Sequence, residues 1–576
     1  MKSKFSIPLI TVLVLIAVYF MVPNTTENQL DTAPKLAMNI IKCTPANFLL
    51  ENVDTTTQIS PLFDNLGEYS FTISTNQKKA QLFFNQGLKL TFAFNHAESH
   101  RSFMEASRLD PNSAMSFWGQ AYALGPNIND SFPDDERKKK SFEAMQRAKN
   151  LISNTSPIEQ DLIEALLHRY SEELDADVES LNSAYMDAMA KVVEKYPNNP
   201  DVLTLYAAAV MNTVPWNYWD NEGNPSPNIK EAKAALEKAI KIDPNHPGAH
   251  HYYIHMVELP KPDLAVSSAE KLGTLMPAAG HLVHMPSHIY IRVGRYKDAV
   301  LANQKAILAD EDYISQCYSQ GMYPLGYYPH NIHFLWSASS LLGDSRVAID
   351  AAKKTAEKVP LGEMTTLPFL QDFASTPLLS YIRFGKWNDI LTTPYPGDDY
   401  QHLKLIWHYA RSIAFIRKNN LKEAREEVDA IAEMTNDENL ENTVVTSNNS
   451  TRTLAKIAYG IAAGEFAASK GEMVAAIKHL KKAVSIEDRL TYTEPSSWHI
   501  PTRQTLGALL LKSQKYEEAE LIYKEDLAIL RQNGWSLIGL YHSLKAQGKT
   551  KEASKIKQEF DKAWAHADVQ INSSVF

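Results

Sequence analysis

The chain has 576 residues and a net charge of −9, with no long block of charges of one sign. It lacks the basic patch by which proteins bind nucleic acid, so a nucleic-acid partner is not expected. It has two cysteines, which excludes a disulfide framework and a cysteine-rich metal site. Any bound metal must therefore use histidine and carboxylate ligands.

The chain begins with a candidate membrane segment, residues 1–22. Lys2 and Lys4 precede the uncharged, mostly apolar run FSIPLITVLVLIAVYFMV. As a helix this run would span about 27 Å, close to the thickness of a bilayer core. No small-residue cleavage pattern accompanies it, so we predict an uncleaved anchor in preference to a cleaved signal peptide. The bulk of the chain is then expected on the non-cytoplasmic side, periplasmic or extracellular, or secreted if the segment is cleaved.

Residues 23–77 are polar and weakly periodic, and we predict a tether there. From residue 78 onward, apolar residues recur with helical spacing, and Gly and Pro separate the helical stretches. We divide this region into an N-terminal array, residues 78–400, and a C-terminal array, residues 401–576.

The first helical stretch fits a two-helix repeat of about 34 residues. In FFNQGLKLTFAFNHAESHRSFMEASRLDP, the small residues Gly87 and Ser99 take repeat positions 8 and 20, and Phe103 takes position 24. Small residues at these positions let the two helices of a hairpin approach closely. The same frame recurs along the chain at small residues that include Ala232, Gly294, Ala299, Gly343, Gly471, Ala476, Gly507, Ala519 and Gly548.

These repeats resemble the tetratricopeptide repeat over most of residues 78–565. The chain also resembles a family of large bacterial repeat proteins with segments of the types FNHAESHRSF, WGQAYALGPNIN, HMPSHIYIRVGRY and YTEPSSWHIPTRQTLGALL. The resemblance implies an all-α fold, a right-handed superhelix of helical hairpins, and no particular activity. Arrays of this kind in general bind peptides on their concave face, which is lined by the first helix of each hairpin.

Histidines gather in three consecutive repeats of the N-terminal array. In the repeat frame they fall on positions that face the concave groove, and Glu258 shares that face. The candidate metal ligands are His251, His255, Glu258, His281, His284, His288, His330 and His333. Residues at i, i+3 and i+7 share one helix face, so His281, His284 and His288 point the same way.

This concentration favours a transition-metal site over two alternatives, a polar groove for a peptide or small molecule and ordinary structural packing. Imidazole and carboxylate suit Zn, Fe, Cu or Mn and do not distinguish among them. Ligating histidines usually donate their other N–H to an outer acceptor, and Glu258, Asp310 and Asp372 are candidates for that role. The competing function is a scaffold that grips a partner's peptide in the same groove.

Weaker candidates lie elsewhere. His96 and His100 have the i, i+4 spacing that suits one metal ion on a helix, although a structural role is favoured for them. Asp372 falls on a groove position in a later repeat, and His499 lies in an aromatic segment before a helix. No phosphate-binding loop, HExxH or GxSxG motif is present, so the sequence does not establish an enzyme.

Overall fold

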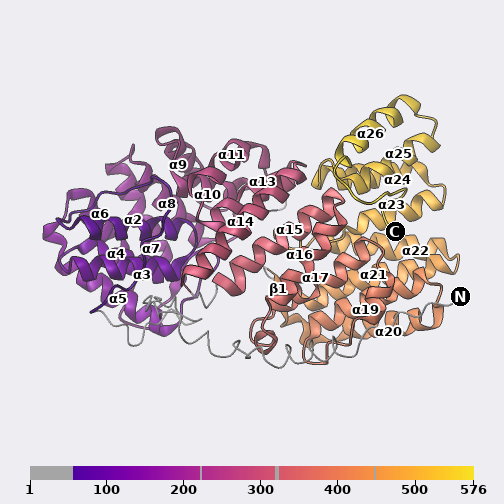
Figure 1. Ribbon diagram of the computed structural model, residues 1–576, viewed down its shortest axis with the longest axis horizontal. Coiled ribbons are helices and arrows are strands. Elements are labelled where there is room, and N and C mark those ends of the chain that lie inside the picture. Colours follow the sequence, from indigo (N-terminus) through magenta and orange to yellow (C-terminus); the bar gives the residue numbers. More distant parts are fainter. Residues whose placement is uncertain (1–55, 221–222, 318–322, 447–448) are drawn as a thin grey trace, which may run out of the picture.

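The computed structural model describes residues 56–220, 223–317, 323–446 and 449–576, and over these residues the fold is almost entirely helical. Antiparallel helical hairpins follow one another along the chain and stack into a superhelix (Figure 1). The predicted all-α array of helical hairpins is confirmed.

The hairpins are given in chain order. The N-terminal ones are α2 (Lys78–Phe92) with α3 (His96–Leu109), α4 (Ala114–Leu124) with α5 (Asp135–Asn150), α6 (Pro157–Leu167) with α7 (Val178–Lys195), and α8 (Pro200–Thr213) with α9 (Ile229–Ile242). The central ones are α10 (Pro247–Val257) with α11 (Val266–Leu275), α12 (Gly280–His284) and α13 (Pro286–Arg292) with α14 (Tyr296–Cys317), α15 (Tyr328–Leu342) with α16 (Ser345–Glu357), and α17 (Phe369–Arg383) with α18 (Trp387–Thr392). The C-terminal ones are α19 (Gln401–Arg417) with α20 (Leu421–Asn436), α21 (Thr451–Ser469) with α22 (Met473–Glu487), α23 (Thr502–Lys512) with α24 (Tyr516–Ile529), and α25 (Gly534–Ala546) with α26 (Thr550–Ala563).

Short elements join some of these helices. Five are single helical turns, and two are short antiparallel strands. They are η1 (Ile152–Asn154), η2 (Pro262–Ala265), η3 (Tyr323–Tyr327, a π-helix), η4 (Leu361–Glu363), η5 (Glu438–Glu441), β1 (Val444–Thr446) and β2 (Asn449–Ser450).

Close packing within each hairpin follows the repeat frame. A Cβ atom added to Gly87 would lie 2.6 Å from the ring of Phe103, and one added to Gly507 would lie 2.4 Å from the ring of Tyr523. Atoms in proteins do not approach this closely. Repeat position 8 must therefore be glycine where the facing residue at position 24 is a large aromatic. Gly294 makes the turn from α13 to α14 with a φ of 79°, a conformation that favours glycine.

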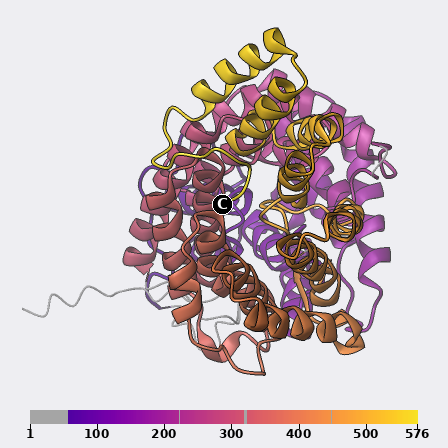
Figure 2. The same ribbon diagram turned by 90° about the vertical axis from the view of Figure 1, so that its right-hand side faces the viewer.

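The superhelix also closes on itself. Trp535 Nε1 in α25 donates to the carbonyl oxygen of Ser340 in α15 at 3.0 Å, and Tyr296 Oη donates to that of Arg531 at 2.7 Å. The end-on view shows the yellow C-terminal helices returning alongside the pink central ones (Figure 2). At the other end, α2 packs against α10. The central hairpins are therefore enclosed from both sides.

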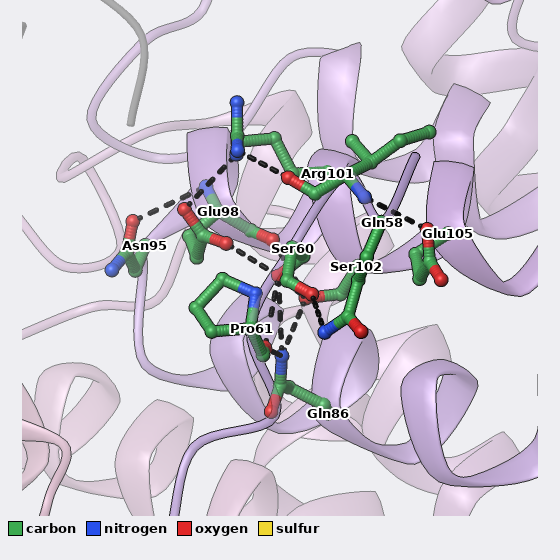
Figure 3. A network of polar contacts seen from close by, with 10 residues as sticks. Gln58, Ser60, Pro61, Gln86, Asn95, Glu98, Arg101, Ser102 and Glu105 are labelled. Carbon is green, nitrogen blue, oxygen red and sulfur yellow. Dashed lines mark hydrogen bonds and ion pairs between the residues drawn. The ribbon is translucent and has the colours of Figure 1, made fainter. Parts of the chain in front are cut away.

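Part of the segment assigned to the tether belongs to the folded body. Ser60 Oγ donates to Glu98 Oε1 at 2.5 Å, and the Ile59 N–H donates to Glu105 Oε2 at 2.9 Å (Figure 3). Arg101 in turn donates to the carbonyl oxygen of Ile59. Apolar side chains of this segment are buried in the core, namely Ile59, Leu66, Phe71 and Ile73. A weakly periodic sequence conceals this packing, because the segment is extended and lies on α2 and α3 without forming a helix.

The predicted anchor, residues 1–22, lies outside the described residues, as do residues 23–55 of the tether. Within the described part of the chain, no helix has both the length and the apolar character needed to cross a bilayer. The anchor and the non-cytoplasmic location remain predictions.

Candidate metal centre

The histidines of the central hairpins lie on the first helix of each hairpin. His251 and His255 are on α10, His281 and His284 on α12, His288 on α13, and His330 and His333 on α15. A cavity of about 1170 Å³ adjoins these helices. Its wall includes His255, His281, His288, His330, His333 and Asp372. His251 and His284 are not part of that lining and are fully buried.

Among the described residues, four groups of side chains bring their potential ligand atoms within 4.8 Å of one another. Site A is His251, His255 and His281, and site B is His284, His288 and His330. Site C is His333, Asp372 and His499. The predicted ligands therefore separate into distinct groups. Glu258 forms a further group with His255 and His288, which connects sites A and B.

The protons of site B can be placed from its hydrogen bonds. Asn303 donates its amide to the carbonyl oxygen of Ala299 at 2.8 Å, so its Oδ1 faces His284 Nδ1, 2.7 Å away. An amide oxygen can only accept, and His284 must therefore carry its proton on Nδ1. His288 Nδ1 lies 2.9 Å from Glu258 Oε2, a contact that favours a proton there too. When both rings are neutral, both Nε2 atoms are then unprotonated.

These two Nε2 atoms lie 2.9 Å apart and are buried. Two lone pairs that face each other at this distance repel unless a metal ion or a proton lies between them, and burial disfavours the extra proton. If one ring instead moved its proton to Nε2, its Nδ1 lone pair would face Asn303 Oδ1 or the Glu258 carboxylate. Site B therefore has the outer acceptors that orient metal-binding histidines and presents the free nitrogens to a common point.

Site A repeats the arrangement. His251 Nδ1 lies 2.6 Å from the carbonyl oxygen of Phe92, at the end of α2, and must donate to it. His255 Nδ1 lies 3.5 Å from Glu258 Oε1. The Nε2 atoms of His251 and His255 are 3.1 Å apart. The contact of α2 with α10 thus fixes the tautomer of one histidine in this pair.

Glu258 connects the two sites through one carboxylate. It is 1% exposed, and its two oxygens face His255 and His288. Burial opposes its ionisation, but the charge that these two imidazoles carry when protonated, together with their hydrogen bonds, lowers its pKa to about 2. Since both oxygens face Nδ1 atoms, the geometry fits an outer acceptor better than a metal ligand.

Each site has a third histidine beside the facing pair, His281 in site A and His330 in site B. His281 lies with its ring centroid 5.1 Å from that of His251, and neither of its nitrogens has a hydrogen-bond partner among the described residues. His330 lies with its centroid 4.8 Å from that of His284. Ligands of a tetrahedral zinc ion lie about 3.4 Å apart, so the imidazole pairs already have ligand spacing and the third rings must move closer.

Aromatic side chains cover both sites. Phe334 lies 4.6 Å from the rings of both His284 and His288. Phe94 lies 4.3 Å from the ring of His251 and has a φ of 56°, which is uncommon for a bulky residue. Such backbone strain persists only where the surrounding structure enforces it. This covering keeps water from much of the imidazole surface.

Burial keeps these histidines neutral. It lowers the pKa of His251, His281, His284 and His330 well below the usual value, and neighbouring histidines lower it further. Neutral imidazole is the form that binds metal.

The free energy of unfolding of the metal-free chain is expected to decrease as the pH decreases. The unfolded chain takes up protons on these histidines as the pH drops below about 6.5, whereas the folded chain does not. Stability is therefore complete above that pH and is lost as the pH falls toward the lowered values. Each such histidine adds up to about 1.4 kcal/mol per pH unit to the slope. Urea unfolding at pH 7, 6 and 5 measures this pH dependence. An unfolding free energy that does not change across this range would contradict the prediction.

The weaker candidates occupy other places. His96 lines the cavity and His100 is buried, but no group of metal-binding side chains in the described part of the chain includes either. Burial lowers the pKa of His96 to about 4 and that of His100 to about 3. Asp310, a candidate outer acceptor, instead accepts from Tyr323 at 2.7 Å and from Asn331 at 2.6 Å.

Sequence reasoning missed Asn303 and His402. Asn303 occupies repeat position 24, which is large and apolar in the comparable hairpins (Phe103, Leu236, Leu480 and Tyr523). This polar exception one helix away from a histidine cluster was the available signal. His402 lies beside Asp372, at 3.6 Å, and nothing in its own sequence context distinguishes it.

The fold and these repeats define a tetratricopeptide-type repeat protein. Residues 228–246, which include α9, match the tetratricopeptide repeat family. No curated protein matches the sequence.

Among solved structures, the human IFIT1 dimer with m7Gppp-AAAA is 14% identical, with a TM-score of 0.32, over 78% of this chain and 90% of that chain. Yeast Tom70 is 11% identical, with a TM-score of 0.29, over 84% of this chain and 93% of that chain. The Cut9 complex with Hcn1 is 12% identical, with a TM-score of 0.29, over 86% of this chain and 77% of that chain. These likenesses are too distant to carry an argument about function.

Proposed function

We propose that the protein binds transition-metal ions at sites A and B, in the central hairpins of its superhelix. The observation that carries the proposal is the pair of facing Nε2 atoms in each site. All four imidazoles of these pairs have an acceptor at Nδ1, provided by a backbone carbonyl, an amide or the shared Glu258. Structural histidines that merely pack have no need of this arrangement.

The ligand set favours some ions over others. Sites A and B offer imidazole nitrogens, which suit Zn, Cu and Fe, whereas Mn prefers sites with more oxygen ligands. Three imidazoles leave a coordination position free, and His255, His281, His288 and His330 reach the cavity wall. An ion held there would be accessible to a small molecule in the cavity, as in metal sites that bind substrate.

The second candidate is a scaffold that binds a partner's peptide. Asparagine side chains and an arginine line the same cavity, and such groups can bind a peptide backbone. They are Asn95, Asn127, Asn129, Asn182, Asn212, Asn217 and Arg101. The two functions are compatible in space, because these residues lie on N-terminal hairpins or their connecting loops and the histidines lie on the central ones.

Metal content decides between them. We expect the full chain, purified in detergent without chelator and supplemented with zinc, to hold metal at both sites. The double substitution His284→Ala and His288→Ala removes both facing nitrogens of site B and should release about one ion per chain. Elemental analysis measures this.

His479→Ala is the matched control, because His479 lies on α22 and belongs to none of the metal-binding groups of the described residues. Its metal content should equal that of the wild type. A wild-type content near zero after supplementation would remove the metal function and leave the scaffold as the better proposal.

A further inference from the structure

Site C is assembled from distant parts of the chain. His333 comes from α15, Asp372 from α17, and His499 from the segment before α23. His499 Nε2 lies 3.3 Å from Asp372 Oδ1, and the ring centroids of His333 and His499 are 4.9 Å apart. His402 on α19 approaches the same carboxylate oxygen at 3.6 Å. Three histidines, from two helices and one connecting segment, thus surround a carboxylate of α17.

This cluster is buried and its hydrogen bonds are incomplete. Asp372 is 2% exposed, His333 is 3% exposed, and the side chain of His499 is 4% exposed. His333 Nε2, His499 Nδ1 and His402 Nε2 have no hydrogen-bond partner among the described residues. Leaving a buried polar atom without a partner is unfavourable. Three such ring nitrogens in one buried cluster favour a role as ligands over a role that only joins the helices.

The donor set differs from those of sites A and B. Site C combines two imidazoles with a carboxylate, and the oxygen of Asp372 that lies 3.3 Å from His499 Nε2 has the spacing of a neighbouring ligand. Two histidines and one carboxylate leave open positions on an octahedral ion and suit Fe(II), and a carboxylate ligand also suits Mn(II). His333 and Asp372 line the cavity, so those open positions would face it.

We propose that site C is a separate metal centre of two histidines and one carboxylate, which binds Fe(II) or Mn(II) with open positions toward the cavity. His402 acts as a positioning residue, because its imidazole approaches the Asp372 oxygen that also meets His499. The two kinds of site would then share one cavity. The ligands of site C are distinct from those of sites A and B, so this inference can fail while the proposed function stands.

Mn(II) binding tests the assignment. The full chain in detergent is stripped of metal and titrated with Mn(II), and the electron paramagnetic resonance signal of the free ion reports binding. We expect one class of Mn(II) sites in the wild type and in the His284→Ala, His288→Ala double variant. Asp372→Asn and His499→Ala should each weaken it more than about tenfold. Their zinc content at sites A and B should remain, which also shows that they fold.

Two controls match these variants. Asp429→Asn changes an exposed aspartate that pairs with Arg425, and His479→Ala changes a histidine outside the groups. Both should bind Mn(II) as the wild type does. Wild-type chain that holds zinc but no Mn(II), or Mn(II) binding that survives both Asp372→Asn and His499→Ala, would overturn site C alone. Absence of every metal would overturn sites A and B as well.

Discussion

Replacing Glu258 with glutamine is expected to weaken metal binding at sites A and B together. The two carboxylate oxygens lie 3.5 Å from His255 Nδ1 and 2.9 Å from His288 Nδ1. The glutamine amide has the same shape but only one accepting oxygen, and its nitrogen is a donor. One of the two histidines must therefore protonate Nε2 and leave its Nδ1 to accept from the amide. That ring is no longer a ligand.

Loss of an outer acceptor costs about 10–100-fold in metal affinity, and here the negative charge that offsets the ion is lost as well. We expect a decrease at or above the upper end of that range for the site whose histidine changes tautomer. Competition titration with a chelator measures it. Glu270→Gln is the control, because the Glu270 side chain is 53% exposed and pairs with Arg295 at the surface. An unchanged affinity would show that Glu258 does not orient these imidazoles.

The repeat frame predicted much of the fold because its physical basis is local. Small residues at position 8 and large residues at position 24 face each other within one hairpin, as Gly87 and Phe103 do. In the repeat frame, His250 falls on a core position and its neighbour His251 on a groove position. In the structure, His250 Nε2 lies 3.1 Å from the carbonyl oxygen of Pro244, whereas His251 enters site A.

The grouping of the candidate ligands was not predictable in the same way. His330 and His333 lie three residues apart on α15, yet one enters site B and the other site C. His333 meets His499, which is far away in sequence, because the C-terminal hairpins fold back on α15. A frame that describes one repeat at a time contains no information on contacts between distant repeats.

The outer acceptors were also hard to predict, because their roles depend on contacts between different repeats. Phe92 contributes to site A only its carbonyl oxygen, at the end of α2, so its side chain gives no sign of the role. Glu258 was predictable because its carboxylate shares the helix face of His251 and His255. Its function as a link between sites A and B depends on α13 lying beside α10, which is a tertiary contact.

Replacing Asn303 with leucine is expected to separate metal binding from stability. Leucine is the residue at the equivalent position of two other hairpins, Leu236 and Leu480, so the hairpin of α13 and α14 can accommodate it in principle. The extra volume costs at most about 1–3 kcal/mol. His284 Nδ1, however, loses the acceptor at 2.7 Å that holds its proton. Ser287 Oγ, at 3.2 Å, remains beside it.

His284 is then free to move its proton to Nε2 and donate it to His288 Nε2. This hydrogen bond occupies both nitrogens that would otherwise bind the metal of site B. We expect site B to lose about 10–100-fold in affinity while site A is unchanged, because the acceptors of site A are Phe92 and Glu258. The reverse substitution, Leu480→Asn, is the matched control. It places an amide in an apolar hairpin core, so it should lower the unfolding free energy by about 1–3 kcal/mol and leave both metal sites intact. Equal metal affinities in the Asn303→Leu variant and the wild type would mean that the polar residue at position 24 does not serve site B, and the tautomer argument for that site would fail with it.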